Sequence, residues 1–199
     1  MRTVVGLGNP GRAYAATRHN VGFMVVEELV RRCHASLVST RRSLRLAHGV
    51  IAGEQTMLVE PQLYMNRSGS ALAEVVPPVT AAELIVVHDD LDLELGCIRV
   101  KRGGGTGGHH GLESIAEHCG TEFTRVRIGI GRPARGEDVV DYVLSPFAAE
   151  QHAAVDAALQ WAADAVECVL REGEEKAMNR FNVRTKSDAT AAPAPIGRK

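Results

Sequence analysis

The feature that most constrains the fold is a glycine-rich turn at residues 6–11, which has the sequence GLGNPG. It follows the apolar pair Val4-Val5 and precedes an apolar segment at residues 21–33, an order that predicts a strand, a turn and a helix. Glycine permits positive φ and close backbone approach, while proline fixes φ and lacks an N–H. A stiff turn of this kind would hold Asn9 and His19 in fixed positions.

Length and apolar content predict one domain. The chain has 199 residues, of which 45% are hydrophobic, and this suffices for a sizeable core. Predicted strands alternate with helices, which is typical of the α/β class, and residues 44–50 and 55–60 predict a hairpin. We therefore expect a single globular domain over residues 1–183, with a twisted mixed β-sheet flanked by helices. Residues 184–199 are rich in alanine, proline and charge and predict a disordered tail.

Charge is unevenly distributed although the net charge is only −1. The first fifty residues carry eight arginines against two glutamates, whereas the next fifty carry two arginines against eight acidic residues. The arginine excess favours local contact with a polyanion rather than a globally basic protein. Four scattered cysteines without a C-x-x-C pair, and the absence of a secretory leader, favour the reducing cytoplasm. No apolar segment approaches the ~20 residues of a membrane span, which predicts a soluble protein.

A helix is predicted from Val21 to Cys33, with Asn20 or Thr17 as its N-cap. His19 would then lie at a helix N-terminus, where the partial positive charge favours a neutral imidazole that can accept a proton. The alternative is that His19 only hydrogen-bonds the turn. This segment alone does not distinguish the two.

Acidic residues follow a short apolar run, residues 84–87, that predicts a buried central strand. Asp89, Asp90 and Asp92 would lie just past the strand end, at the rim where α/β proteins place their sites. A calcium loop is disfavoured because Leu95 stands where such a loop needs glycine. The leucines at 91, 93 and 95 alternate as in a half-buried extended segment.

A connecting segment at residues 61–69 carries an aromatic and an amide side chain. Pro61 would end the second hairpin strand, and Ser68 would cap a helix over residues 70–75. Tyr64, Met65 and Asn66 would then lie on a loop, where they either bind a ligand or cover the core edge and satisfy the turn. Pro77-Pro78 would break the chain before the central strand.

Residues 103–111 include six glycines, and Lys101 and Arg102 precede them. Glycine-rich amides that lead into a helix, here at residues 112–118, suit an anion when cations stand beside them. A strand at residues 124–131 would place Arg125 and Arg127 on one face, which fits a phosphate backbone or a solvated surface. Further predicted elements are residues 139–144, a helix at 148–170 with a buried stripe (Ala158, Trp161, Ala162, Ala165, Val169), and a helix at 174–181.

Two other kinds of site remain open from the residues alone. The glycines at 6, 8 and 11 match a dinucleotide fingerprint, but the helix does not begin at the third glycine and no acid ends a second strand ~20 residues later. A metal site would draw on five side chains but lacks a tight ligand spacing. These side chains are His88, Asp89, Asp92, His109 and His110.

Six segments in order along the chain together resemble bacterial peptidyl-tRNA hydrolases. They are GLGNPG at 6–11, Tyr14 with TRHNVG at 17–22, YMNRSG at 64–69, HDDLD at 88–92, GGH at 107–109 and RIGIGRP at 127–133. Each is weak alone, but their register from residue 4 to about 183 is very specific. The resemblance implies a monomeric cytoplasmic α/β enzyme, without metal or other cofactor. It implies that this enzyme hydrolyses the ester between a peptide and the 3′ ribose of tRNA.

The resemblance also implies roles for particular residues. His19 would be the catalytic base, and Asp89 would keep it basic and oriented. Asn9 and Asn66 would position the substrate, Asn9 being linked to discrimination between peptidyl and free aminoacyl esters. Side chains implied to contact the substrate or the tRNA end are Tyr14, Tyr64, Met65, His109 and His110, and those implied to grip a tRNA phosphate are Lys101 and Arg127.

One position departs from the family pattern, because His110 stands where asparagine is usual. An imidazole can donate one hydrogen bond and accept another, so we expect retained activity with altered affinity or pH dependence. Residues 132–142 resemble a segment that the family is considered to use as a mobile lid. The competing hypothesis is an inactive RNA- or ribosome-binding relative, which the intact His19, Asp89, Asn9 and Asn66 disfavour.

Overall fold

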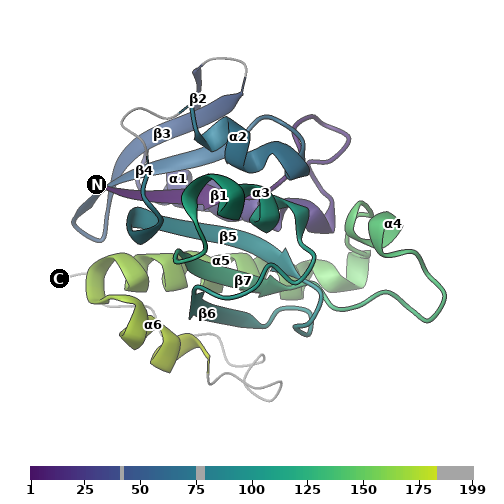
Figure 1. Ribbon diagram of the computed structural model, residues 1–199. Helices are drawn as coiled ribbons and strands as arrows, with labels where there is room; N and C mark the ends of the chain where they lie inside the picture. Colours follow the sequence, from purple (N-terminus) through teal and green to yellow (C-terminus); the bar gives the residue numbers. More distant parts are fainter. Residues whose placement is uncertain (41–42, 75–78, 183–199) are drawn as a thin grey trace.

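The computed structural model describes residues 1–40, 43–74 and 79–182. Seven strands form one sheet in the order β2-β3-β4-β1-β5-β7-β6 (Figure 1). Their bounds are β1 Arg2–Gly6, β2 Val38–Thr40, β3 Leu44–Ile51, β4 Glu54–Pro61, β5 Leu84–Asp90, β6 Ile98–Arg102 and β7 Thr124–Gly129. The four strands β4, β1, β5 and β7 run parallel, while β2, β3 and β6 pair antiparallel at the two sides. The predicted mixed sheet and the hairpin are confirmed.

Helices cover both faces of the sheet (Figure 1). Their bounds are α1 Val21–Arg32, α2 Ser68–Leu72, α3 His110–Cys119, α4 Val139–Val143, α5 His152–Glu172 and α6 Glu174–Phe181. Successive side chains of a strand point to opposite faces, so Val4 packs with α1 and α5 while Val5 packs with α2 and α3. The α/β fold in one domain agrees with the expectation, as do the ends of α6.

Strand β5 is longer than predicted and reaches the polar residues. It lies between β1 and β7, which confirms its central place, but Asp89 and Asp90 belong to the strand rather than following it. Residues 91–95 form turns, so the predicted extended segment with alternating leucines is wrong. The turn is fixed by Asp90 Oδ1, which accepts from the backbone N–H of Asp92 at 2.8 Å.

Several predicted helix boundaries also differ. Ser68 begins α2 instead of capping a helix from residue 70, and its hydroxyl donates to the Met65 carbonyl at 2.8 Å. Met65 and Asn66 lie in a 3-10 turn, Met65–Arg67, rather than an open loop. The long helix starts at His152, after a 3-10 turn, and ends at Glu172, with Trp161 only partly buried.

The predicted caps of α1 are used differently. Asn20 does occupy the N-cap and Thr17 precedes the 3-10 turn Arg18–Asn20, but neither side chain caps a helix. Thr17 donates to the Tyr14 carbonyl instead, and Asn20 bonds the backbone of Asn9. Residues 77–78 and the predicted tail at 184–199 lie outside the described residues. None of the helices in the described residues has the length and apolar character needed to cross a bilayer.

Candidate active site

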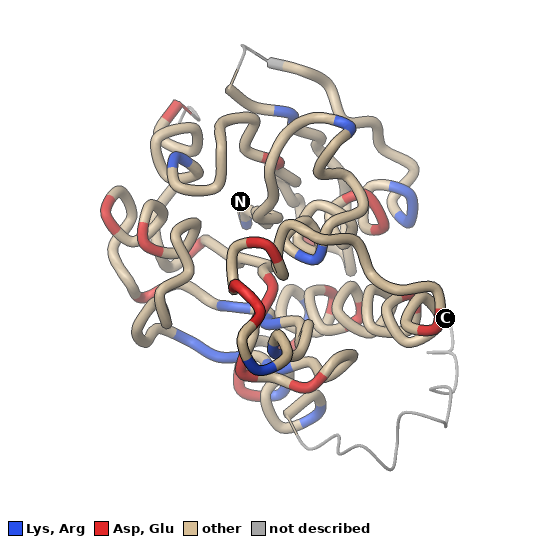
Figure 2. The backbone as a smooth tube through the Cα atoms, turned by 90° about the vertical axis from the view of Figure 1, so that its right-hand side faces the viewer, with Lys and Arg blue, Asp and Glu red and all other residues tan. Residues whose placement is uncertain are grey.

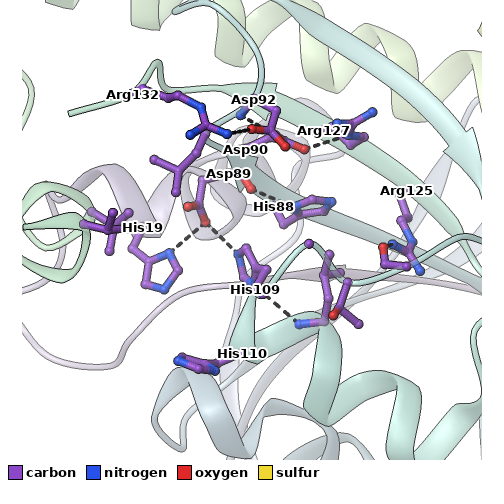
Figure 3. Close-up of a pocket in the computed structure, with 18 of the residues that line it drawn as sticks. His19, His88, Asp89, Asp90, Asp92, His109, His110, Arg125, Arg127 and Arg132 are labelled. Carbon is purple, nitrogen blue, oxygen red and sulfur yellow. Dashed lines mark hydrogen bonds and ion pairs between the residues drawn. The ribbon is translucent and has the colours of Figure 1, made fainter. Parts of the chain in front are cut away.

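A cavity of about 430 Å³ opens where the parallel strands end. Its walls come from the end of β5, the glycine-rich segment with the start of α3, strands β6 and β7, and helix α4 (Figure 3). Figure 2 looks onto this side of the molecule, where acidic and basic segments lie close together rather than in fields of one sign. Ligands of open α/β sheets bind at this edge, because the loops after neighbouring strands meet there.

His19 and Asp89 meet in this cavity, although seventy residues separate them. His19 Nδ1 lies 2.8 Å from Asp89 Oδ1, and both side chains are largely shielded from solvent. The 3-10 turn before α1 supplies His19 and β5 supplies Asp89. A carboxylate only accepts, so Nδ1 is the donor and Nε2 is left as the basic nitrogen of the ring.

Asp89 has a second imidazole neighbour, His109. Its Nε2 lies 2.9 Å from the same Asp89 Oδ1, while its Nδ1 accepts from backbone N–H groups as the N-cap of α3. Burial alone would raise the pKa of Asp89, but the imidazoles of His109 and His19 lower it well below its usual range. Asp89 is therefore a fixed negative charge at neutral pH.

A third imidazole, His88, lies beneath the pair and was considered from the sequence only as a metal ligand. Its Nδ1 donates to the Asp89 carbonyl at 2.7 Å. Burial lowers the pKa of His88 to about 3, with His109 adding to the effect, so the ring stays neutral. The alternation of side chains along β5 could have shown that it points to the opposite face from Asp89.

Asn9 is held by a network that the sequence did not reveal. Its Oδ1 accepts from the backbone N–H of Met65 at 2.9 Å, and Asn20 bonds both its N–H and its C=O at 2.9 Å. The Asn9 side-chain nitrogen has no partner among the described residues, so it can donate to a ligand. A Cβ added at Gly111 would lie 2.6 Å from Met65 Sδ, so this group packs against α3 beside His109.

The two tyrosines form a separate pair, in which Tyr64 is exposed and Tyr14 is partly exposed. The rings of Tyr14 and Tyr64 lie 6.4 Å apart at 87°, with Tyr64 61% exposed and Asn66 on the surface nearby. These side chains do not line the cavity that holds His19, and neither do Asn9 and Met65. The structure thus places the predicted residues on two adjoining patches.

The predicted cations differ in their surroundings. Lys101 is exposed at the cavity, whereas Arg127 Nε pairs with Asp90 Oδ2 at 2.7 Å. Arg125 shares a face with Arg127 as predicted, but it is buried and donates to the carbonyls of residues 104 and 105. The prediction that Arg125 faces a phosphate backbone or solvent is wrong, because its guanidinium orders the glycine-rich segment. Arg102 instead pairs with Glu174.

His110 is the first residue of α3 and is exposed. Its Nδ1 lies 3.0 Å from Glu113 Oε2 one helical turn later. One ring nitrogen is therefore used on the helix surface, and Nε2 is available at the cavity wall.

The segment predicted as a lid contains α4, which lies beside the cavity. Val139 and Val140 are exposed there, and Arg132, which also lines the cavity, pairs with Asp92. Helix α4 and the segment that follows it are held to the residue before His19. The buried Arg18 guanidinium stacks on the ring of Tyr142 in α4, at 4.5 Å, and on the ring of Phe147 after it, at 4.7 Å. Local sequence patterns gave no signal for this buried cation, because both rings come from more than 120 residues away.

Two glycines of the first turn, Gly6 and Gly8, are required by packing. A Cβ at Gly6 would lie 2.2 Å from the Gly22 carbonyl oxygen, and one at Gly8 would lie 2.7 Å from the Phe23 ring. The turn is therefore pressed against α1, which gives the fingerprint spacing a structural cause other than a dinucleotide. Among the described residues, only His19, Asp89 and His109 cluster with metal-ligand spacing, so His88, Asp92 and His110 do not join them.

Fold and site define an α/β protein with an imidazole–carboxylate pair in an open cavity beside a glycine-rich segment. The family model described as peptidyl-tRNA hydrolase matches residues 3–190. A peptidyl-tRNA hydrolase of Rubrobacter xylanophilus is 51% identical over 90% of this chain and 99% of that protein. One of Roseiflexus sp. is 47% identical over 92% of this chain and 86% of that protein.

A solved structure is similar as well. The crystal structure of peptidyl-tRNA hydrolase from Acinetobacter baumannii superimposes with a TM-score of 0.84 at 38% identity, covering 93% of this chain and 96% of that one. The chain belongs to the peptidyl-tRNA hydrolase family.

Proposed function

We propose that this protein hydrolyses the ester bond between the peptide and the 3′ ribose of tRNA in peptidyl-tRNA. The observation that carries the proposal is the contact of His19 with the buried Asp89 in the open cavity of a chain of this family. The tRNA released after abandoned synthesis would return to translation. We therefore propose that the enzyme acts in the cytoplasm. We further propose that one copy of the chain suffices and that no metal takes part.

In the proposed mechanism His19 Nε2 takes a proton from water as the oxygen of that water attacks the ester carbonyl. Asp89 orients the ring through Nδ1 and offsets the imidazolium charge that develops. The carbonyl oxygen becomes an oxyanion, which neutral donors stabilise when they point at it beforehand. When this intermediate collapses, the bond from the carbonyl carbon to the 3′ ribose oxygen breaks, and the His19 imidazolium gives its proton to the leaving ribose oxygen. We propose the Asn9 side-chain nitrogen, on the patch that adjoins the cavity, as one such donor. It has no hydrogen-bond partner among the described residues, and the two bonds from Asn20 to the Asn9 backbone hold it in place.

The tRNA would contact residues on both sides of the cavity. Lys101 and Arg127 are proposed to bind a phosphate, where Asp90 would hold the Arg127 fork in place. Tyr14 and Tyr64 expose ring surface on which unpaired 3′ nucleotides can stack. Asn66 and His110, together with the buried Met65, are proposed to contact the part of the substrate that runs from the tyrosine pair to His19.

A release assay tests the proposal. N-blocked aminoacyl-tRNA serves as the substrate, with free aminoacyl-tRNA and a chelator-treated sample run beside it. We expect cleavage of the blocked ester alone, at the same rate with chelator. Binding of tRNA without cleavage would instead support an inactive RNA-binding relative, and loss of cleavage with chelator would support a metal-dependent hydrolase.

A further inference from the structure

His109 is the second imidazole on the Asp89 carboxylate, and the proposed mechanism gives its ring no proton to move. His19 Nδ1 and His109 Nε2 lie 2.8 Å and 2.9 Å from the same Asp89 Oδ1 (Figure 3). The two rings are 5.0 Å apart. Among the described residues no group hydrogen-bonds to Nε2 of His19, so that nitrogen can accept a proton from water, whereas His109 needs another role.

Backbone groups fix the proton position on His109. Its Nδ1 accepts from the N–H of Gly111 at 3.2 Å and from that of Leu112 at 3.4 Å. A ring nitrogen that accepts carries no proton, so the proton of this ring is on Nε2. Nε2–H then donates to Asp89 Oδ1, and both nitrogens of the ring are used inside the protein.

We infer that His109 is a positioning residue, whose Nε2–H holds the Asp89 carboxylate against His19 and whose ring nitrogens do not bind substrate. This inference rests on the proposed function, because it assigns His109 a task within the same hydrolysis. It replaces the substrate contact that the family resemblance implies for this side chain.

The surroundings of the ring support a fixed orientation. His109 is mostly buried, and the His88 ring stands at 76° to it with the centroids 5.1 Å apart. A Cβ at Gly111 would lie 3.1 Å from His109 Cε1, so glycine at that position leaves the ring the space it occupies. His88 also hydrogen-bonds the Asp89 backbone carbonyl, so both the backbone and the carboxylate of Asp89 are held in place.

Sharing Asp89 Oδ1 between two donors has a consequence for His19. The bond from His109 goes to the same Asp89 oxygen that faces His19, so it reduces the negative charge that this oxygen offers to His19. Removing the His109 donor should therefore move the acid limb of the pH–rate profile to higher pH. Replacing His109 leaves the other charged and titratable groups at the cavity unchanged. These are the pairs Asp90–Arg127, Asp92–Arg132 and His110–Glu113, together with Lys101 and Arg125.

Two variants of the full chain separate the two bonds of the ring. His109→Asn keeps an acceptor for the first N–H groups of α3 but is too short to reach Asp89, so only the Asp89 bond is lost. His109→Gln places an amide N–H near the position of Nε2 and restores the donor. We expect His109→Asn to lower kcat about tenfold with KM within about twofold, and to move the acid limb up by about 0.5 to 1 pH unit. His109→Gln should recover at least half of the lost kcat and return the limb toward the parent position.

The contrary results are distinct. A raised KM with unchanged kcat in His109→Asn would show that the ring binds substrate. A merely structural role would lower kcat in His109→Asn without moving the acid limb of the pH–rate profile, and His109→Gln would not recover the lost kcat. Nitrogen-15 spectra of the parent read the tautomer without any turnover, and we expect His109 protonated at Nε2 at pH 7.5. A proton on Nδ1 would overturn the inference even in an active enzyme. If the parent cleaves no ester, the proposed function fails while the tautomer is still decided.

Discussion

Two buried carboxylates lie near the carboxyl ends of β5 and β4, on either side of β1, and their surroundings differ. Asp89 accepts from two imidazoles through one oxygen. Glu60 has one charged partner, Arg45, 2.8 Å from Oε2, and its Oε1 is buried without a hydrogen-bond partner among the described residues. Burial raises the pKa of Glu60 to about 7, against the opposing effect of Arg45, whereas the pKa of Asp89 falls. Donors rather than depth thus decide whether a buried carboxylate keeps its charge.

The two groups affect stability in opposite pH ranges. The stabilising contribution of Asp89 is present above about pH 4, the unfolded value, and is lost as the pH falls through its lowered folded pKa. For Glu60 the contribution is present below about pH 4.5 and is lost as the pH rises through about 7. Asp89 is therefore ionised at neutral pH without cost to the fold, whereas the ionisation of Glu60 destabilises the fold there.

Among the changes that test this comparison of charged groups, removing the charge of Asp89 should have the largest effect on turnover. Asp89→Asn keeps the shape but offers an amide that cannot hold His19 in the same tautomer, so we expect kcat to fall about a thousandfold. Steady-state release of N-blocked amino acid from tRNA measures this. An exposed aspartate on α5, changed in Asp156→Asn, is the matched control and should leave kcat unchanged. Activity within twofold of the parent in Asp89→Asn would break the comparison.

The same change at Glu60 should stabilise the fold and spare catalysis. Glu60→Gln is neutral at every pH, so the free energy of unfolding should rise by about 2 to 3 kcal/mol at pH 8 and differ little at pH 5. Urea unfolding between pH 5 and 8 gives both values. Glu54→Gln, at the exposed start of the same strand, is the control. If the free energies of unfolding of the parent and of Glu60→Gln depend on pH in parallel, ionisation of the buried Glu60 carboxyl is not the cause of the stability lost at high pH.

Arg125 extends the comparison to a buried cation whose partners are carbonyls. Burial lowers its pKa, and its guanidinium bonds the carbonyls of residues 104 and 105 while it stacks on Phe123 at 4.7 Å. Arg125→Met should free the glycine-rich segment, with backbone hydrogen exchange at residues 103–108 faster by about tenfold and kcat/KM lower by a similar factor. Arg171→Met on α5 is the control. Unchanged hydrogen exchange at residues 103–108 in Arg125→Met would show that this segment stays ordered without the Arg125 guanidinium.

His110 is exposed, in contrast to the buried Asp89, Glu60 and Arg125, so its replacement should have the smallest effect of the four. His110→Asn replaces the imidazole beside Glu113 with the amide that the family resemblance implies at this position. We expect kcat/KM to change by no more than about threefold at pH 7.5, with a larger difference from the parent at pH 5.5. Profiles from pH 5.5 to 8 give the comparison. Superimposable curves would show that this charge does not reach the substrate.

Much of the fold follows from local pattern, whereas the buried charges do not. Val4-Val5 before the glycine turn, the run before Asp89 and the hairpin pattern predict β1, β5 and β3-β4 because apolar alternation and turn residues act locally. The segments that supply His19 and Asp89 could be found this way, and the family motifs named the pair. Arg18 stacks on Tyr142 and Phe147, which lie more than 120 residues away, so no local window contains its partners. Glu60 and Arg45 do pair within the predicted hairpin, but the burial of Glu60 also depends on β1, which packs beside β4 and comes from the start of the chain.

The central claim is that His19, oriented by Asp89, is the base of the reaction. Turnover and tRNA affinity measured on the same folded preparation of His19→Ala test it most directly. The account predicts that release of N-blocked amino acid falls to the background rate while the Kd for tRNA stays within a few-fold of the parent. Full activity in folded His19→Ala would contradict it.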